Sequence, residues 1–346
     1  MTLADLWFVA VAVLFTGYLV LEGFDFGVGM LMPIVGRGKS EEADVKRRVL
    51  LNTIGPVWDG NEVWVITGGG ALFAAFPGWY ATAFSALYFP LLLILVGLIT
   101  RVVAIEWRGK INDPRWRHWC DIGIGLGSWI PAILWGAAFA NFLRGLPIDA
   151  NHQFTGNLLD ILSPYALLGG AATCLLFLFH GALFLGIKTA GEVQQQAMKL
   201  AARLAIPAVA VGGGWLLWTQ FAYGNAWTWI AVIVAVVSAV GALVAAFANR
   251  DGWGFAASSL TIGAVAATIF GSMYPVLLPS TISHAYDLTV SNASSTHYTL
   301  TVMTWATVVV LPVVLCYQAW TYWVFRQRIS VEHIPPSIGL PLRETV

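Results

Sequence analysis

The stretch Leu21-Glu-Gly-Phe-Asp-Phe-Gly-Val-Gly-Met30 places two carboxylates, Glu22 and Asp25, inside the first long apolar run of the chain. A charged side chain is costly within a membrane, so intramembrane Asp and Glu usually face the interior of a helix bundle or a polar cavity. The two carboxylates are three residues apart, which puts them on one face of a helix. This stretch therefore predicts a buried polar site within a membrane protein.

The composition agrees with a polytopic membrane protein. The 346 residues are 58% hydrophobic and include 17 Trp, but only 18 Lys and Arg and 18 Asp and Glu. That balance excludes a soluble single domain, and the net charge of zero offers no basic surface for nucleic acid. Tryptophan is enriched where spanning helices meet the membrane surface. The three cysteines are widely spaced, so we interpret them as small apolar residues and not as metal ligands or disulfide partners.

Nine segments are long and apolar enough to cross a membrane, which takes about 20 residues. We expect them at Leu6–Val35, Leu50–Phe76, Trp79–Glu106, Trp119–Leu143, Tyr165–Ile187, Leu204–Phe221, Trp227–Ala248, Trp253–Leu278 and Leu300–Phe325. The second is the least hydrophobic. The sequence thus predicts an all-α fold of nine transmembrane helices in a single integral membrane domain.

The positions of Lys and Arg predict how the helices are oriented. With nine spans, all of these residues except Arg144 fall on one side of the membrane. Positively charged loops stay in the cytoplasm. The N-terminus is therefore expected outside and the C-terminus inside.

A second pair of carboxylates lies in Pro56-Val-Trp-Asp-Gly-Asn-Glu-Val-Trp64, where Asp59 and Glu62 are again three residues apart. At 1.5 Å per residue, Asp25 and Asp59 lie at similar depth, roughly 13–16 Å from the cytoplasmic ends of their helices. A short loop joins the two helices. Up to four carboxylates are therefore expected to converge in the inner half of the membrane. Asn61 is able to orient or relay a proton, or equally to cap a bent helix.

Two interpretations of these carboxylates stay open. In the first, each carboxylate has a purely structural role: it pairs with Arg101 or accepts hydrogen bonds from exposed backbone. Such backbone is expected where Gly55-Pro56, Gly60 and the glycines of the first span loosen the helices. Alternatively they mark a proton path, because buried carboxylates can lose and regain a proton in the working pH range. We favour the proton path for Asp25 and Asp59 together.

Other motifs favour structural roles. His180 is the only histidine well inside a span, and a lone buried histidine is more often a satisfied core residue than a ligand. The glycine-rich stretches Gly68–Gly70, Gly123–Gly127 and Gly212–Gly214 lie in apolar spans with no strand before them. They predict close helix packing rather than phosphate binding.

Several stretches of this sequence resemble subunit II of cytochrome bd quinol oxidases. They are Glu22–Met30, Pro56–Trp64, Gly69–Phe76, Arg101, Trp107–Lys110, Met303–Trp305 and Tyr322–Arg326. The similarity covers nearly the whole chain, and the first two stretches are the most specific. The compact outer loops are similar to those of the actinobacterial branch.

The resemblance implies a complex in the bacterial plasma membrane that oxidises quinol, reduces oxygen to water and generates proton motive force. It implies that a separate subunit I carries haem b and haem d, while this chain ligates neither haem nor metal. Membrane quinol, lipids and small single-span subunits are further implied partners. A bound quinone, menaquinone in particular, is also implied for this chain.

The resemblance also implies an architecture and site roles. Two four-helix bundles, residues 1–144 and 160–280, are followed by a peripheral ninth helix, 297–328, and a cytoplasmic tail, 329–346. Asp25 and Asp59 match positions that feed protons from the cytoplasm toward the oxygen-reducing haem, and Trp58 stands beside that route. Two rival functions are a proton-coupled transporter, which suits intramembrane carboxylates and glycine-broken helices, and a purely structural scaffold for subunit I.

Overall fold

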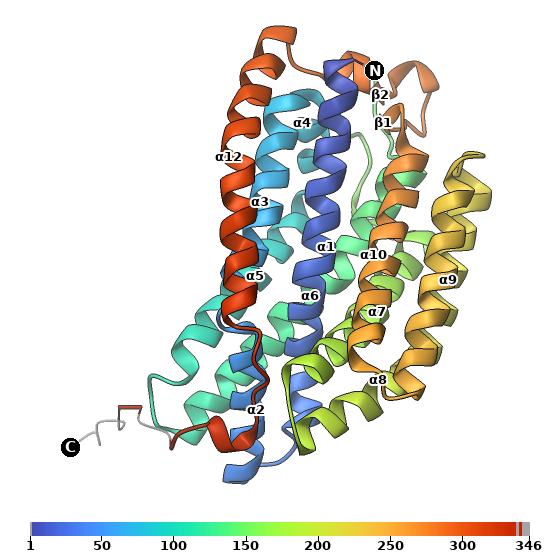
Figure 1. Ribbon diagram of the computed structural model, residues 1–346. Coiled ribbons are helices and arrows are strands. Elements are labelled where there is room, and N and C mark those ends of the chain that lie inside the picture. The colour runs from blue at the N-terminus through green and yellow to red at the C-terminus, as the bar shows by residue number, and fades with distance from the viewer. Residues whose placement is uncertain (1, 337–338, 341–346) are drawn as a thin grey trace.

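The structure, a computed structural model, describes residues 2–336 and 339–340, so Arg343 and most of the predicted tail beyond 336 lie outside the described residues. The chain is mostly helical (Figure 1). The helices are α1 Leu3–Val35, α2 Glu41–Ile54, α3 Trp58–Ala75, α4 Pro77–Ala86, α5 Tyr88–Arg108, α6 Pro114–Arg144, α7 Pro164–Lys188, α8 Glu192–Tyr223, α9 Thr228–Phe247, α10 Asp251–Met273, α11 Val290–Ala293 and α12 His297–Val324. Two short strands, β1 Val276–Leu278 and β2 Leu288–Thr289, pair antiparallel, and the 3-10 helices are η1 Leu158–Ile161, η2 His284–Tyr286 and η3 Val331–His333.

Eight of the described helices are long and apolar enough to cross a membrane: α1, α5, α6, α7, α8, α9, α10 and α12. Helix α3 is not among them, because its first turns carry Asp59, Asn61 and Glu62. It nevertheless runs beside α1 within the bundle (Figure 1). A ninth span through α3 therefore stays a prediction.

The second and third expected spans are each two helices, so the prediction of continuous helices there was wrong. The segment Leu50–Phe76 is interrupted between Ile54 and Trp58, where Pro56 lacks an amide hydrogen and cannot continue a helix. The segment Trp79–Glu106 is interrupted at Leu87, which joins α4 to α5. The polar helix α2 precedes the first break and lies at the end of the bundle opposite the N-terminus (Figure 1).

The expected span Trp253–Leu278 also ends early. Helix α10 stops at Met273, and Tyr274 adopts an extended conformation (φ −69°, ψ 133°). A residue before proline is pushed toward extended geometry, and Pro275 follows it. The last residues of the expected span form β1, which belongs to a cap on the N-terminal end of the bundle. In that cap the Leu146 amide donates to Pro279 O (3.0 Å), so the loop after α6 and the loop after β1 lie against each other.

Helix α1 occupies the middle of the fold and packs against α3, α6, α7 and α10. Its glycines permit close approach instead of loosening the helix, which continues unbroken through them. A Cβ on Gly181 of α7 would lie 2.6 Å from the Gly27 backbone, and one on Gly29 would meet Ser128 of α6. The expected loosening of α1 by glycine is therefore wrong, because small residues serve here to bring helices together.

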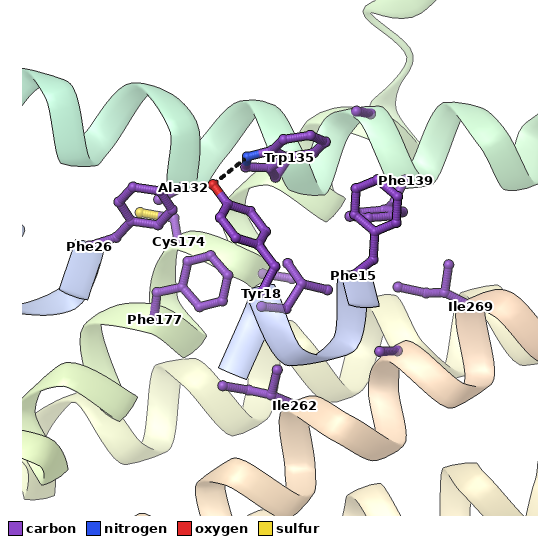
Figure 2. Close-up of a cluster of buried hydrophobic side chains, with 14 of the residues drawn as sticks. Phe15, Tyr18, Phe26, Ala132, Trp135, Phe139, Cys174, Phe177, Ile262 and Ile269 are labelled. Carbon is purple, nitrogen blue, oxygen red and sulfur yellow. Dashed lines mark hydrogen bonds between the residues drawn. The ribbon is translucent and has the colours of Figure 1, made fainter. Parts of the chain in front are cut away.

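The core is largely aromatic (Figure 2). Phe15 and Tyr18 of α1 point toward Trp135 and Phe139 of α6, and Phe15 and Phe139 meet edge to face at 5.8 Å between ring centroids. The Trp135 indole N–H donates to the Tyr18 hydroxyl (3.0 Å). Large rings bury much apolar surface, and edge-to-face pairs stabilise the core beyond that burial. This core holds α1, and with it Glu22 and Asp25, in a fixed place.

Ion pairs tie α2 to both sides of the bundle. Arg108 of α5 contacts Asp44 of α2 (2.8 Å) and Asp121 of α6 (2.5 Å). Lys46 of α2 reaches Glu192 of α8 (2.7 Å). The hydrogen bond that Lys46 donates to Glu192 is the main cause that holds the pKa of Lys46 above its usual 10.5. The same end of the bundle therefore carries a dense set of paired charges.

Helix α12 lies along one edge of the molecule, beside α3 (Figure 1). Of its residues only Leu300 is buried. Met303 and Tyr322 are partly buried and pack on the core. Hydrogen bonds add to this packing: the Trp7 indole donates to Thr304 Oγ1 (3.0 Å), and Trp64 donates to Gln318 Oε1 (2.8 Å).

Candidate functional site

A buried ion pair forms one half of the candidate site. Arg101 lies on the face of α5 that packs on α6, where Gly127 has no side chain to obstruct it; a Cβ there would lie 2.6 Å from that of Arg101. The guanidinium donates to Glu22 of α1, and both side chains are completely buried. Its Nη1 also lies 3.3 Å from Glu62 Oε1 of α3, a side chain that is 16% exposed. Arg101 therefore joins three helices.

A hydrogen-bonded chain forms the other half. Asp25 is fully buried, and its Oδ2 accepts from the amide of Asn61 on α3 (2.7 Å). The carbonyl oxygen of Asn61 accepts from the Tyr322 hydroxyl on α12 (2.7 Å). Gln318 Nε2 lies 3.5 Å from the same oxygen, at the limit of a hydrogen bond. The carboxylate of α1 is therefore connected to the peripheral helix through one asparagine.

The structure brings together three of the four predicted carboxylates. Glu22 and Glu62 meet at Arg101, and Asp25 lies one helical turn from Glu22. Asp59 is apart from them: it lies in the first turn of α3, is exposed, and has no hydrogen bond or ion pair to any described residue. Trp58 beside it is half-buried. Helical spacing alone predicted convergence, but it did not determine which way α3 turns.

Four polar atoms in this site lack a hydrogen-bond partner among the described residues. They are Glu22 Oε2, Asp25 Oδ1 and the Nε and Nη2 atoms of Arg101. Buried polar atoms of native proteins are nearly always paired with protein or with water. The site therefore offers both acceptors and donors at its centre, as a path for protons or water requires.

His180 lies outside this cluster and is fully engaged. Its Nδ1 lies 2.7 Å from Ser258 Oγ and its Nε2 lies 3.1 Å from Val20 O. The ring stacks on Phe255 with 4.7 Å between centroids. It is the satisfied core residue that the sequence analysis favoured, and with both nitrogens in use it does not suit a haem iron. No group of three metal-ligating side chains is present in residues 2–336 and 339–340.

The glycine stretches gave a mixed result. Gly68, Gly123 and Gly127 contact neighbouring helices, as expected of close packing, whereas an added Cβ at Gly69, Gly70 or Gly125 would meet nothing within 4 Å, so close packing was wrong at those three positions. At Gly212, Gly213 and Gly214 an added Cβ would meet nothing within 4 Å, so close packing was wrong there. These three glycines line an open cleft of about 410 Å³ among α7, α8, α9 and α10.

Sequence reasoning missed Gln318 and Tyr322. The two lie four residues apart on α12, so they share a helix face, and both reach Asn61. The available signal was a glutamine inside an otherwise apolar last span. A polar residue within a span usually faces protein, and here it does.

Comparison with known proteins agrees with the resemblance. The family described as cytochrome bd terminal oxidase subunit II matches residues 3–325. Cytochrome bd ubiquinol oxidase subunit 2 of Bacillus subtilis is 40% identical over 335 residues, which cover 95% of this chain and 97% of that protein. Cytochrome bd-I ubiquinol oxidase subunit 2 of Escherichia coli is 35% identical, with 95% and 96% covered. A chain of the bd oxidase from Geobacillus thermodenitrificans shares the fold, with a TM-score of 0.77 at 18% identity over 94% of this chain and 99% of that chain.

Proposed function

Because this chain belongs to the cytochrome bd terminal oxidase subunit II family, we propose that it stabilises a haem-bearing subunit I and lines a proton path from the cytoplasm toward the oxygen-reducing haem. The chain is a multi-pass bacterial membrane protein and a subunit of a terminal quinol oxidase, an oxidoreductase complex. The proposed complex oxidises membrane quinol, reduces oxygen to water and generates proton motive force.

The burial of Asp25 carries the proposal. Its Oδ2 is held by Asn61, and its Oδ1 is buried without a partner, so one oxygen is able to take up and release a proton. Exposed Asp59 suits proton uptake at the start of the path, with Trp58 beside it. Glu62 contacts Arg101 from the same face of α3 and extends the path inward. Glu22 pairs closely with Arg101 and is assigned to the frame of the site.

The helix contacts support the proposed architecture. In it, helices α1, α3, α5 and α6 form a first bundle (within 1–144), α7 to α10 form a second (160–280), and α12 (within 297–328) is peripheral. With α3 as a ninth span, the N-terminus lies outside, and the tail from 329 onward lies inside. The basic, ion-paired end around α2 then faces the cytoplasm, as positively charged loops do.

We expect haem b and haem d in subunit I. A quinone bound to this chain is part of the proposal. An apolar groove of about 890 Å³ runs along α1, α3 and α10, with Asp5 and Tyr274 at one end and Trp64 among its lining residues. Its size and lining suit an isoprenoid quinone such as menaquinone. Lipids and small single-span subunits are further proposed partners.

The decisive experiment measures quinol-driven oxygen uptake and haem content on the same purified complex carrying Asp59→Asn or Asp25→Asn. We expect normal haem content and strongly reduced uptake. Glu106→Gln is the matched control, because Glu106 is exposed at the end of α5 and has no hydrogen bond or ion pair to any described residue.

Other outcomes select the remaining alternatives. Loss of haem together with loss of uptake would assign these carboxylates to assembly and favour the scaffold function. Normal uptake in both amide variants would end the proton-path proposal. Membership of an oxidase family leaves a separate proton-coupled transporter without support.

A further inference from the structure

The side chain of Trp64 begins a set of hydrogen bonds with a defined direction. An indole N–H can only donate. Trp64 Nε1 lies 2.8 Å from the amide group of Gln318, so the Gln318 oxygen must face Trp64. The Gln318 amide nitrogen then faces the other way, toward Asn61 at 3.5 Å. A donor-only group thus determines the orientation of the first amide.

The orientation of Asn61 follows from that of Gln318. An amide nitrogen and a tyrosine hydroxyl both approach the same side of Asn61, at 3.5 and 2.7 Å, and both are donors there. That side must be the carbonyl oxygen. The Asn61 nitrogen consequently faces Asp25 Oδ2 at 2.7 Å and donates to it. Gln318 and Tyr322 of α12 and Trp64 of α3 therefore determine that the nitrogen of Asn61, and not its oxygen, faces Asp25.

We propose that Tyr322 and Gln318 of α12 are positioning residues for proton transfer: they hold Asn61 as a donor to Asp25 Oδ2, so that Asp25 takes up and releases its proton at Oδ1. The O–H bond forms at Oδ1 when a proton arrives and breaks when the proton leaves. Oδ1 is the buried oxygen without a partner among the described residues. The inference rests on the proposed proton path.

The alternative orientation shows why the direction matters. If the Asn61 amide turned over, its oxygen would face Asp25 and would accept a hydrogen bond from the protonated carboxyl. The proton would then be retained at Oδ2, between two oxygens, instead of moving on. When the Asn61 amide is held in one orientation, Oδ2 is occupied by its N–H and is not protonated. Oδ1 is then the one oxygen of Asp25 that can take up and release a proton.

The test uses the purified oxidase complex carrying Tyr322→Phe, alone and combined with Gln318→Met. Tyr317→Phe is the matched control, because Tyr317 is an exposed tyrosine of the same helix whose hydroxyl has no partner among the described residues. Three quantities are measured: oxygen uptake with its kcat and KM for quinol, haem content, and the infrared carbonyl band of Asp25, identified by its loss in Asp25→Asn.

The expected result for Tyr322→Phe is a kcat lowered about 2- to 10-fold, the usual range for one hydrogen bond. KM and haem content stay unchanged, and the Asp25 band moves. The double variant moves it further, while Tyr317→Phe leaves kcat and the band as they are.

Two results would overturn the inference. One is normal kcat with an unmoved band in the double variant. The other is loss of haem with an unmoved band, which would show that α12 serves assembly alone. Failure of the proton path itself is recognised separately, because Asp25→Asn would then turn over at the normal rate.

Discussion

Removing Arg101 alone is expected to destabilise the protein much more than removing Arg101 and Glu22 together. Both side chains are completely buried and paired, so Arg101→Met leaves a carboxylate without its partner. Breaking one member of a buried pair costs about 3–5 kcal/mol. The loss of the contact with Glu62 adds little to this free-energy cost, because the Glu62 side chain is 16% exposed and keeps some access to solvent.

The double variant Glu22→Met/Arg101→Met removes both charges. Replacing a buried pair with apolar side chains of similar volume is often neutral or stabilising. The native pair is also incompletely satisfied, since Glu22 Oε2 and two nitrogens of Arg101 have no partner among the described residues. We therefore expect the double variant to be close to the parent in stability, even if its turnover is impaired.

The assay is the rate at which the purified complex loses its haem absorbance at a fixed elevated temperature. If the whole loss of stability appears in the unfolding rate, Arg101→Met unfolds about 100-fold to several thousand-fold faster than the parent. The double variant should unfold within about tenfold of the parent rate. Equal rates for the single and the double variant would refute the reasoning, because the unpaired charge would then not be the cause.

Three further predictions follow from contacts outside the site. Gly181→Ala should lower the thermal midpoint of the complex, because its Cβ would lie 2.6 Å from the backbone of α1, whereas Gly213→Ala, open on all sides, should leave it unchanged or higher. His180→Leu should lower stability but leave the haem absorbance spectrum of the assembled complex unchanged; an altered spectrum would mean that this side chain contacts a haem. Lys46→Met should speed limited proteolysis of α2 near pH 8, and because the pKa of Lys46 is raised by its pairing with Glu192, the native α2 should lose this support only as pH rises above about 10.5.

The sequence predicted that the carboxylates lie on α1 and α3. It did not predict the direction in which each side chain points. Every residue of α1 from Glu22 to Met32 is buried, so a polar side chain on any face of this part of the helix becomes buried. Helix α3 lies at the margin, and Asp59 and Asn61 point about 200° apart on it, so Asp59 faces away when Asn61 faces Asp25. Hydropathy carries no information on which of the two faces inward. The outcome depends on which helices pack beside α3.

The helix breaks have a local signal in the sequence. Gly55-Pro56 marks the end of α2, and the charges of α2 distinguish it from the apolar helix that follows. The break at Leu87 also has a proline, Pro90, which suits only the first turn of a helix and so marks the start of α5. The contact between Tyr322 and Asn61 spans 261 positions of the sequence, and no periodic pattern connects residues at that separation.

The attachment of α12 has a consequence for biogenesis. Its partners Trp7, Asn61 and Trp64 lie on α1 and α3, whereas α12 is synthesised after all the other long helices of the described residues. Until it docks, the Asn61 amide beside Asp25 has no hydroxyl to orient it, and the growing protein holds an unfinished polar site. Docking needs α1 and α3 already in register, because three hydrogen bonds must form along one face. Completion of the Asp25–Asn61 site is thereby delayed until α12 has been inserted and the early helices have folded correctly.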